Sequence, residues 1–222
     1  MWLTGLSGLA MILIGGVTYA RQRKVLGSPG LGRAKGRVPQ APIVGSYNDG
    51  NMKTTLRAST DMPIEERLAT IQDLVEKSVQ DPQMRKAALM VTSRCPERDK
   101  ICEAEAIYQA VKHRVRYTGD VGSIQHSDGS VDGIDLYQSA RRTLEMGGGD
   151  CDDQAIVNAT LLALNGFDPV LRVVKQKGDK DWSHIYAGFY HGTKFVALDT
   201  TLPGNNNFGI EGPYAKYKDF VA

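Results

Sequence analysis

Segments with helical hydrophobic spacing come first in this 222-residue chain, and strand-like segments follow. This order constrains the fold more than any other feature of the sequence. Apolar residues recur at helical spacing between residues 61 and 116 and again after residue 154, which predicts amphipathic helices that build a core. Short apolar or alternating runs follow and predict β-strands. The helices are expected to begin near Asp61, Asp81, Arg98, Ser139 and Cys151, and the strands to span Pro169–Val174, His184–Tyr190 and Lys194–Asp199. Helices followed by strands indicate an α+β domain with a C-terminal antiparallel sheet.

The first twenty residues contain no charged side chain. At about 1.5 Å rise per residue, a helix of this length crosses a hydrocarbon layer about 30 Å thick, so we predict one transmembrane helix over residues 1–20. A secretory signal peptide is the alternative, but it needs a basic segment before the apolar stretch, and only the N-terminal amine precedes Trp2. The basic residues Arg21, Arg23 and Lys24 follow directly and favour the cytoplasmic side for the rest of the chain.

Residues 21–58 are rich in glycine and proline, and we predict a linker there, followed by a globular domain over residues 59–222. Residues 1–50 carry six basic side chains and one acidic side chain, which favours contact of residues 1–24 with anionic lipid head groups. The whole chain is nearly balanced, with a net charge of +2. The basic segment is too short and sparse for a nucleic-acid arm, so the expected partner of this part is a membrane.

Cys151 is the strongest candidate for a reactive residue. It follows Gly147-Gly148-Gly149-Asp150 and opens an apolar helix, where unpaired N–H groups and the helix dipole favour a thiolate. A buried structural cysteine is the alternative, but the surrounding Asp150, Asp152 and Asp153 make the segment too polar for that. These carboxylates would oppose a thiolate unless they turn away or bind helix N–H groups or arginines such as Arg141 and Arg142. The nucleophile therefore needs a cationic partner.

His184 and Asp199 supply such a partner and its orienting group. They lie fifteen residues apart on two consecutive predicted strands, and adjacent antiparallel strands can bring them side by side. The carboxylate would then fix the imidazole tautomer while the other ring nitrogen faces Cys151. Taken alone, a strand histidine is more often a partly buried side chain, and an aspartate that ends a strand is more often a cap. Their combination with Cys151 indicates a Cys-His-Asp site for acyl transfer.

These segments resemble the transglutaminase-like superfamily, in particular its small bacterial and phage members. The resemblance covers about Cys95 to Thr201 and rests on Gly-Gly-Asp-Cys-Asp-Asp before a helix, Ser-His-Ile-Tyr on a strand and Leu-Asp-Thr at a strand end. It implies a transglutaminase-like, papain-like cysteine proteinase fold. It also implies Cys151 as nucleophile, His184 as general base and acid, and Asp199 as the orienting residue. Gln138 is a candidate second oxyanion donor, with a plain capping or loop amide as the alternative.

The resemblance further implies thiolate attack on a peptide or isopeptide amide, an acyl-enzyme, and resolution by water or by an amine. We expect hydrolysis more than transamidation, with a peptide or protein substrate. The alternative is a catalytically silent, membrane-tethered binding or virion assembly module. If the chain is phage-encoded, the membrane is that of a virion. We expect no metal and no cofactor, because the mechanism needs neither and no nucleotide, haem or flavin motif is present.

Two further expectations concern the segments between these motifs. Cys95 and Cys102 are seven residues apart, which in a continuous helix separates them by about 10.5 Å along the axis, so we expect reduced thiols. If the helix begins late and Cys95 folds back, a disulfide forms and indicates an oxidising compartment. Half a zinc site is the third possibility. Residues 118–134 are polar and glycine-rich, and we expect a long loop there.

Overall fold

The computed structural model describes residues 43–49, 52–58, 63–120, 123–125 and 131–222. The predicted transmembrane helix over residues 1–20 and the predicted linker up to residue 42 lie outside these ranges, so both stay predictions. None of the helices within the described ranges has both the length and the apolar character that spanning a membrane requires.

The helices form largely where the periodicity predicts them. They are α2 (Ile64–Val79), α3 (Pro82–Thr92), α4 (Lys100–Arg114), α5 (Ala140–Met146) and α6 (Cys151–Leu164). Side-chain caps set the beginnings of α3 and α4: Asp81 accepts from the N–H of Gln83, and Asp99 accepts from the N–H of Cys102. α4 is shorter than expected because the cap at Asp99 starts it only at Lys100.

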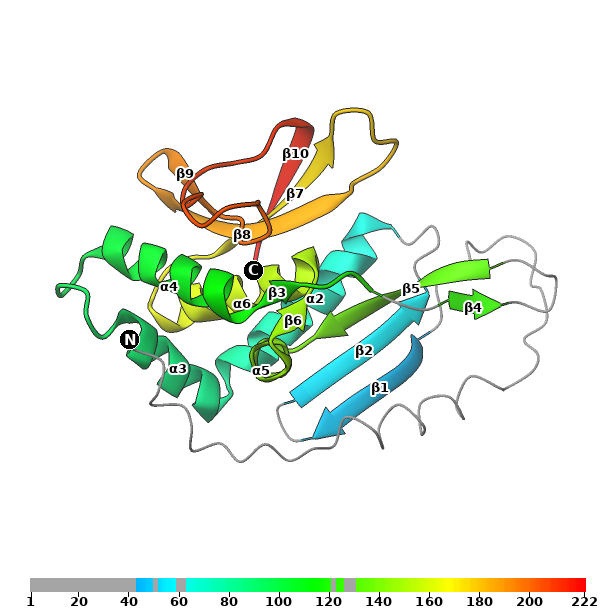
Figure 1. Cartoon of the computed structure of the whole chain (residues 1–222), viewed down its shortest axis with the longest axis horizontal. Coiled ribbons are helices and arrows are strands. Elements are labelled where there is room, and N and C mark those ends of the chain that lie inside the picture. The colour runs from blue at the N-terminus through cyan, green and yellow to red at the C-terminus, as the bar shows by residue number, and fades with distance from the viewer. Residues whose placement is uncertain (1–42, 50–51, 59–62, 121–122, 126–130) are drawn as a thin grey trace. The chain divides into compact units, whose positions relative to one another are not determined.

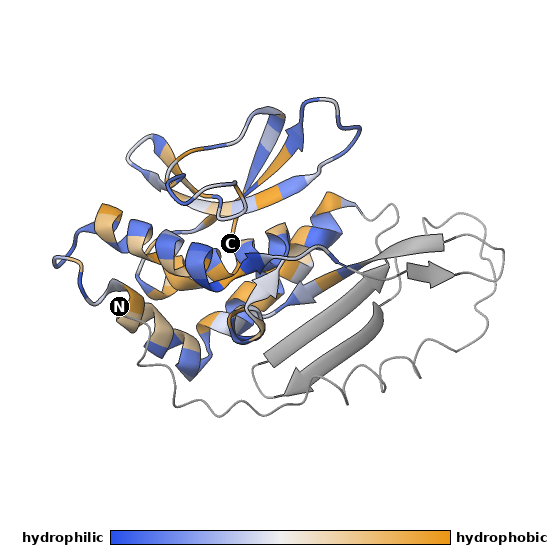
Figure 2. Ribbon diagram, in the orientation of Figure 1, coloured by the Kyte–Doolittle hydropathy of each residue, from blue (hydrophilic) through white to orange (hydrophobic). Residues whose placement is uncertain are grey.

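α6 is the centre of the core. Eleven of its fourteen residues are buried, because it is packed on all sides. It contacts α2, α3, α4 and α5 on one side and β8 (His184–His191) on the other, and Figure 1 shows it between the C-terminal sheet and the remaining helices. The elements that meet there carry hydrophobic residues on their facing sides (Figure 2). The residue that opens this helix therefore has a rigidly held backbone.

The C-terminal sheet is antiparallel, as predicted, and contains one strand more than expected. Its order is β10-β7-β8-β9, with β7 (Val170–Gln176), β9 (Lys194–Leu198) and β10 (Tyr214–Val221) beside β8. β8 pairs with β9 in a register that sets Ala187 opposite Leu198. Asp199, the next residue, is thereby brought to the same end of the sheet as His184.

A second sheet corrects two predictions. Its order is β1-β2-β5-β4, with β1 (Ile43–Asp49), β2 (Met52–Ala58), β4 (Ser123–Gln125) and β5 (Val131–Gln138). β1 and β2 fall in the segment predicted as linker, and β4 and the start of β5 fall in the segment predicted as loop. The linker and loop predictions are wrong for these residues, because their backbones pair as strands. β1 pairs with β2 and β4 with β5, and β2 pairs with the distant β5, where Leu56 lies opposite Leu136.

Cys95 and Cys102 form a disulfide, so the expectation of two reduced thiols is wrong. α3 ends at Thr92 and α4 starts at Lys100, so the two cysteines are not on one helix. The chain between them folds back and brings their Cα atoms to 5.6 Å, within the range that a disulfide spans. Cys151 is left as the free cysteine of the chain.

Candidate active site

Cys151 is the first residue of α6, as predicted. Asp150 precedes it as the N-cap, and its side chain accepts from the N–H groups of Asp152 and Asp153 at 3.2 and 3.4 Å. The backbone before the cap passes very close to the helix: a Cβ on Gly149 would lie 2.6 Å from the Cβ of Asp153. Glycine is therefore required at that position, and the turn leaves the half-buried Cys151 thiol facing a pocket.

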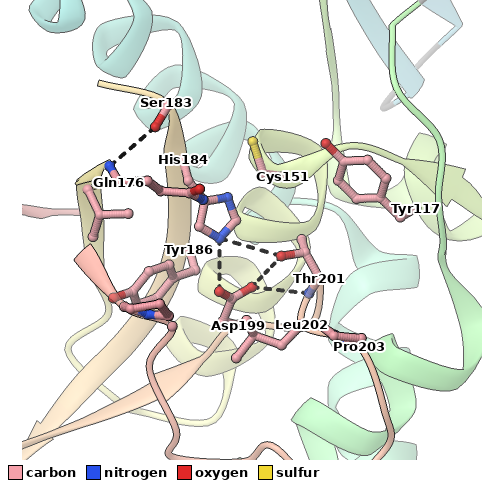
Figure 3. Close-up of a pocket in the computed structure, with 13 residues that line it drawn as sticks. Tyr117, Cys151, Gln176, Ser183, His184, Tyr186, Asp199, Thr201, Leu202 and Pro203 are labelled. Atoms are coloured by element: carbon pink, nitrogen blue, oxygen red, sulfur yellow. Dashed lines mark hydrogen bonds and ion pairs between the residues drawn. The ribbon is translucent and has the colours of Figure 1, made fainter. Parts of the chain in front are cut away.

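His184 and Asp199 meet as predicted. The Nε2 of His184 donates to the Oδ2 of Asp199 over 2.8 Å, and its other ring nitrogen faces Cys151 (Figure 3). Thr201 holds the carboxylate from the other side: its hydroxyl and its backbone N–H donate to Asp199 Oδ1 at 2.6 and 3.1 Å. The three residues proposed from the sequence thus lie in a row, with the imidazole between sulfur and carboxylate.

The surroundings of His184 favour its charged form. Burial by itself lowers the pKa of the imidazole, but the hydrogen bonds to Asp199 and Cys151 and their charges outweigh it and raise the pKa to about 10. Burial likewise raises the pKa of Asp199, and the bonds from His184 and Thr201 bring it below its ordinary value. At neutral pH the pair is therefore an imidazolium beside a carboxylate.

This pair makes both the imidazole titration and the stability depend on pH. The folded-state pKa of His184 lies above its unfolded value of about 6.5, so its stabilising contribution is complete below pH 6.5 and is lost as pH rises toward 10. Asp199→Asn removes the main charge partner, and we expect the NMR-detected titration of His184 to move down by at least about one unit. Asp168→Asn, which removes an exposed carboxylate outside the pocket, is the matched control. An unchanged titration in Asp199→Asn would contradict this assignment.

The carboxylates next to Cys151 are either buried, as in Asp152 and Asp153, or bound to helix N–H groups, as in Asp150. Burial raises the pKa of Asp152 well above its ordinary range, helped by its hydrogen bond with Asp150. Burial and the charge of Asp150 also raise the pKa of Asp153, although bonds from Gln138 oppose this. Both shifts favour the uncharged carboxyl, which lessens the repulsion that a thiolate would meet.

Gln138 corrects another prediction. Its side-chain Nε2 donates to Asp153 Oδ2 at 2.7 Å and to the carbonyl of Gly148 at 3.3 Å, and its backbone N–H donates to Asp153 Oδ1 at 2.7 Å. With both amide hydrogens used inside the protein, Gln138 is not placed to bind an oxyanion. It instead ties the end of β5 to the first turn of α6.

The same acidic residues form a group that could hold a cation. Asp150, Asp152 and Asp153 each offer one oxygen, and these atoms lie within 4.8 Å of one another. The carboxylates already serve as a helix cap and as acceptors for Gln138. The raised pKa values of Asp152 and Asp153 also disfavour the ionised form that a cation would need as its ligand.

A pocket of about 330 Å³ extends from Cys151 along the sheet. Beyond the three central residues, it is lined by Tyr117, Val174, Gln176, Ser183, Tyr186, Thr201, Leu202, Pro203, Gly212 and Pro213. Tyr186, one of the lining residues, is fixed by Glu211. The Glu211 carboxylate accepts from the hydroxyl of Tyr186 at 2.6 Å and from Arg172 at 2.8 Å. The pocket therefore has fixed walls and offers a mixed apolar and amide surface.

Comparison with known proteins identifies the family. A sequence model described as the transglutaminase-like superfamily matches residues 89–200, half of the chain. The chain belongs to the transglutaminase-like superfamily. The resemblance seen over Cys95 to Thr201 is thereby confirmed, and this membership, together with the site around Cys151, supports a cysteine-dependent enzyme in general.

The other comparisons add little to the superfamily assignment. A solved structure from Cytophaga hutchinsonii, described as a "Putative Cysteine Protease", is similar at 15% sequence identity and a TM-score of 0.43. The similarity covers 77% of this chain and 59% of the other, so the chain spans less than two thirds of that protein. No curated protein matches the chain.

Sequence reasoning missed Thr201 and Tyr117. Thr201 is two residues after Asp199, and a hydroxyl residue just after a strand-end aspartate was a local signal that could have found it. Tyr117 lies 34 residues before Cys151, and no pattern links the two; it reaches the pocket through backbone pairing with Gly149.

Proposed function

We propose that this chain performs cysteine-dependent acyl transfer on peptide or isopeptide amides, with Cys151 as nucleophile, His184 as general base and acid, and Asp199 as the orienting residue. The observation that carries the proposal is the imidazole held 2.8 Å from Asp199 with its free nitrogen toward the thiol of Cys151. A base that lies beside the nucleophile, and that is itself oriented by a third group, activates nucleophiles of this kind.

The reaction follows from this arrangement. The Cys151 sulfur attacks the amide carbonyl carbon, a C–S bond forms, and the C=O π pair moves to the oxygen. When that pair returns, the C–N bond breaks and the leaving amine takes the proton of the His184 imidazolium. The neutral imidazole then removes a proton from water, whose oxygen attacks the thioester carbon. The C–S bond breaks, the acid leaves, and the Cys151 thiolate is restored beside the His184 imidazolium.

We propose water rather than an amine as the usual acceptor. A protonated alkylamine would be drawn to a carboxylate, and Asp199, the carboxylate among the described residues that line the pocket, is engaged by His184 and Thr201. Water needs no such subsite. Adding a primary amine during turnover is therefore expected to change the ratio of hydrolysis to aminolysis products little, whereas efficient conversion to amide at millimolar amine would favour transamidation.

Trapping of the acyl-enzyme tests the proposed function. The full chain, incubated with p-nitrophenyl acetate and quenched in acid, is expected to gain one acetyl group on the peptide that contains Cys151. Protein first blocked with iodoacetamide is the control, since Cys151 is its free cysteine. No acetylation at Cys151, despite full alkylation of the thiol, would contradict the proposal and favour a silent binding module.

We further propose that residues 1–20 anchor the domain to a membrane and that residues 21–24 contact its lipid head groups. The Cys95–Cys102 disulfide supports an oxidising compartment for the domain, on the side opposite to the one that the basic flank favours. Protease added to intact spheroplasts is then expected to digest the domain, and full protection would place it in the cytoplasm.

A further inference from the structure

A second hollow, of about 20 Å³, opens beside Cys151 and His184, and we call it the small hollow. It shares Cys151, Ser183 and His184 with the larger pocket, so the nucleophile borders both, and Arg67 of α2 lines it as well. The acyl and amine parts of a trans amide extend from the reacting carbon in opposite directions. A substrate amide held at Cys151 can therefore place one part in the larger pocket and the other toward the small hollow.

Arg67 brings a charged group with unused donors to the small hollow. It lies between Ile64 and Ile71 at helical spacing, on the face of α2 that lines the hollow, and its side chain is 33% exposed. Its Nε donates to the hydroxyl of Tyr137 at 3.4 Å and lies 3.5 Å from Asp135 Oδ2. The two terminal nitrogens have no acceptor among the described residues. The edge of the guanidinium that binds carboxylates through two parallel hydrogen bonds is therefore available.

The charges around the small hollow favour an anion. Burial raises the pKa of Asp152, the carboxyl in its wall, and so favours the uncharged form. Asp135 offsets part of the guanidinium charge, but it does not line the hollow. The Nζ of Lys218 lies 5.3 Å from the centre of the Trp182 ring, which does line it, and adds a second positive charge. Lys218 is 3.7 Å from Glu65, and because both side chains are exposed, solvent screens that pair.

The size of the small hollow selects a small anionic group. A space of about 20 Å³ holds one water-sized group, which excludes a bulky side chain and suits a carboxylate oxygen. Apolar side chains form much of its wall, namely Ile64, Ile71, Val173, Trp182 and Ile185. Such walls lower the local dielectric and strengthen an ion pair formed against them. A carboxylate with one oxygen in the hollow would thus meet the free edge of the guanidinium.

We propose that Arg67 is a substrate-binding residue, which binds a carboxylate that the substrate carries close to the reacting amide. The inference rests on the proposed function and narrows its substrate class to amides with an acidic group beside the bond that is cleaved. That group belongs either to the acyl part or to the leaving amine, and the experiment below distinguishes the two. Arg67 takes no part in making or breaking bonds and keeps its proton throughout.

Two alkylating reagents of nearly the same shape test the recognition of charge without acyl transfer. Iodoacetate carries a carboxylate where iodoacetamide carries a neutral amide, and the Cys151 sulfur displaces iodide from both. In the full chain, Arg67→Gln is expected to slow alkylation by iodoacetate at least about threefold and to leave iodoacetamide within about 1.5-fold. Arg67→Lys keeps the charge and should recover part of the loss. Equal effects on the two reagents would overturn the inference, and so would no effect on iodoacetate.

Two esters then show which part of the substrate approaches Arg67. Mono-p-nitrophenyl adipate carries its carboxylate on the acyl part, 4-acetoxybenzoate carries it on the leaving group, and p-nitrophenyl acetate is the neutral reference. Arg67→Gln is expected to lower turnover of one of the two anionic esters by about tenfold and to leave the neutral ester within about twofold. Losses below twofold with both anionic esters, or an equal loss with all three, would contradict a carboxylate site at Arg67.

Arg85→Gln is the matched control, because it removes an exposed arginine from α3, outside both the larger pocket and the small hollow. It is expected to leave every one of these rates unchanged. Failure of the proposed function looks different: the unsubstituted chain would then turn over none of the three esters. The comparison of iodoacetate with iodoacetamide still tests Arg67 in that case, because alkylation needs only the Cys151 thiol.

Discussion

Cys151→Ala is expected to reduce acyl transfer to p-nitrophenyl acetate to the rate of the reaction in buffer, the largest effect that any single substitution should produce. The other two cysteines are joined in a disulfide, so no second thiol is available to replace it. In enzymes where a nucleophile and its base act as a unit, loss of the nucleophile costs up to about 10⁶ in turnover. The fold should tolerate alanine, because the Cys151 side chain is only half-buried.

The measurement for Cys151→Ala is p-nitrophenolate release at equal protein concentration, with far-ultraviolet circular dichroism to show that α6 has formed. Cys151→Ser is the conservative companion, since it keeps an oxygen nucleophile of nearly the same shape. It should retain the fold and only traces of activity. Turnover above about a tenth of the original rate in the alanine variant would place the nucleophile elsewhere.

His184→Ala is expected to lower acyl transfer by about 10² to 10⁴, the range that a positioned general acid and base supplies. The imidazole lies between Asp199 and Cys151, and its raised pKa of about 10 keeps it cationic at neutral pH, so its loss removes both the thiolate's counter-charge and the proton for the leaving group. Deeper pocket residues are untouched, so the substrate concentration for half-maximal rate should change less than the maximal rate.

His191→Ala is the matched control for this loss. His191 ends the same strand, β8, but is exposed and does not line the pocket. It should keep the full rate. Imidazole added at millimolar concentration is expected to restore part of the activity of His184→Ala, because the side chain leaves a space between Asp199 and the thiol. A drop of equal size in both histidine variants would contradict the assigned role.

The sequence predicts those parts of the fold and the site that are determined by residues close to one another along the chain. Asp150 and the glycines before it mark the start of α6, and its apolar residues mark a buried helix, so Cys151 could be placed at a helix N-terminus. His184 and Asp199 fall on consecutive strands, and antiparallel pairing of consecutive strands is the commonest outcome. The meeting of these three residues therefore followed from short-range patterns.

The parts that were missed depend on long-range pairing. β10 carries charged and aromatic residues in no simple alternation, and it forms because Tyr217 to Val221 pair with the far strand β7. β2 pairs with the distant strand β5, and β1 in turn pairs with β2. Tyr117 and Gln138 owe their positions to contacts with Gly149 and Asp153, and the Cys95–Cys102 bond depends on where α4 begins.

The measurement that tests the central claim most directly is the pH dependence of iodoacetamide alkylation at Cys151, in the full chain and in His184→Ala. A thiol without a cationic partner titrates near pH 8.5, so its alkylation slows about tenfold for each pH unit below that. With the His184 imidazolium beside it, alkylation of Cys151 is expected to change by less than about threefold between pH 6 and 8, and His184→Ala should restore the tenfold-per-unit decline. Identical, steeply falling profiles in the two proteins would contradict a thiolate–imidazolium pair.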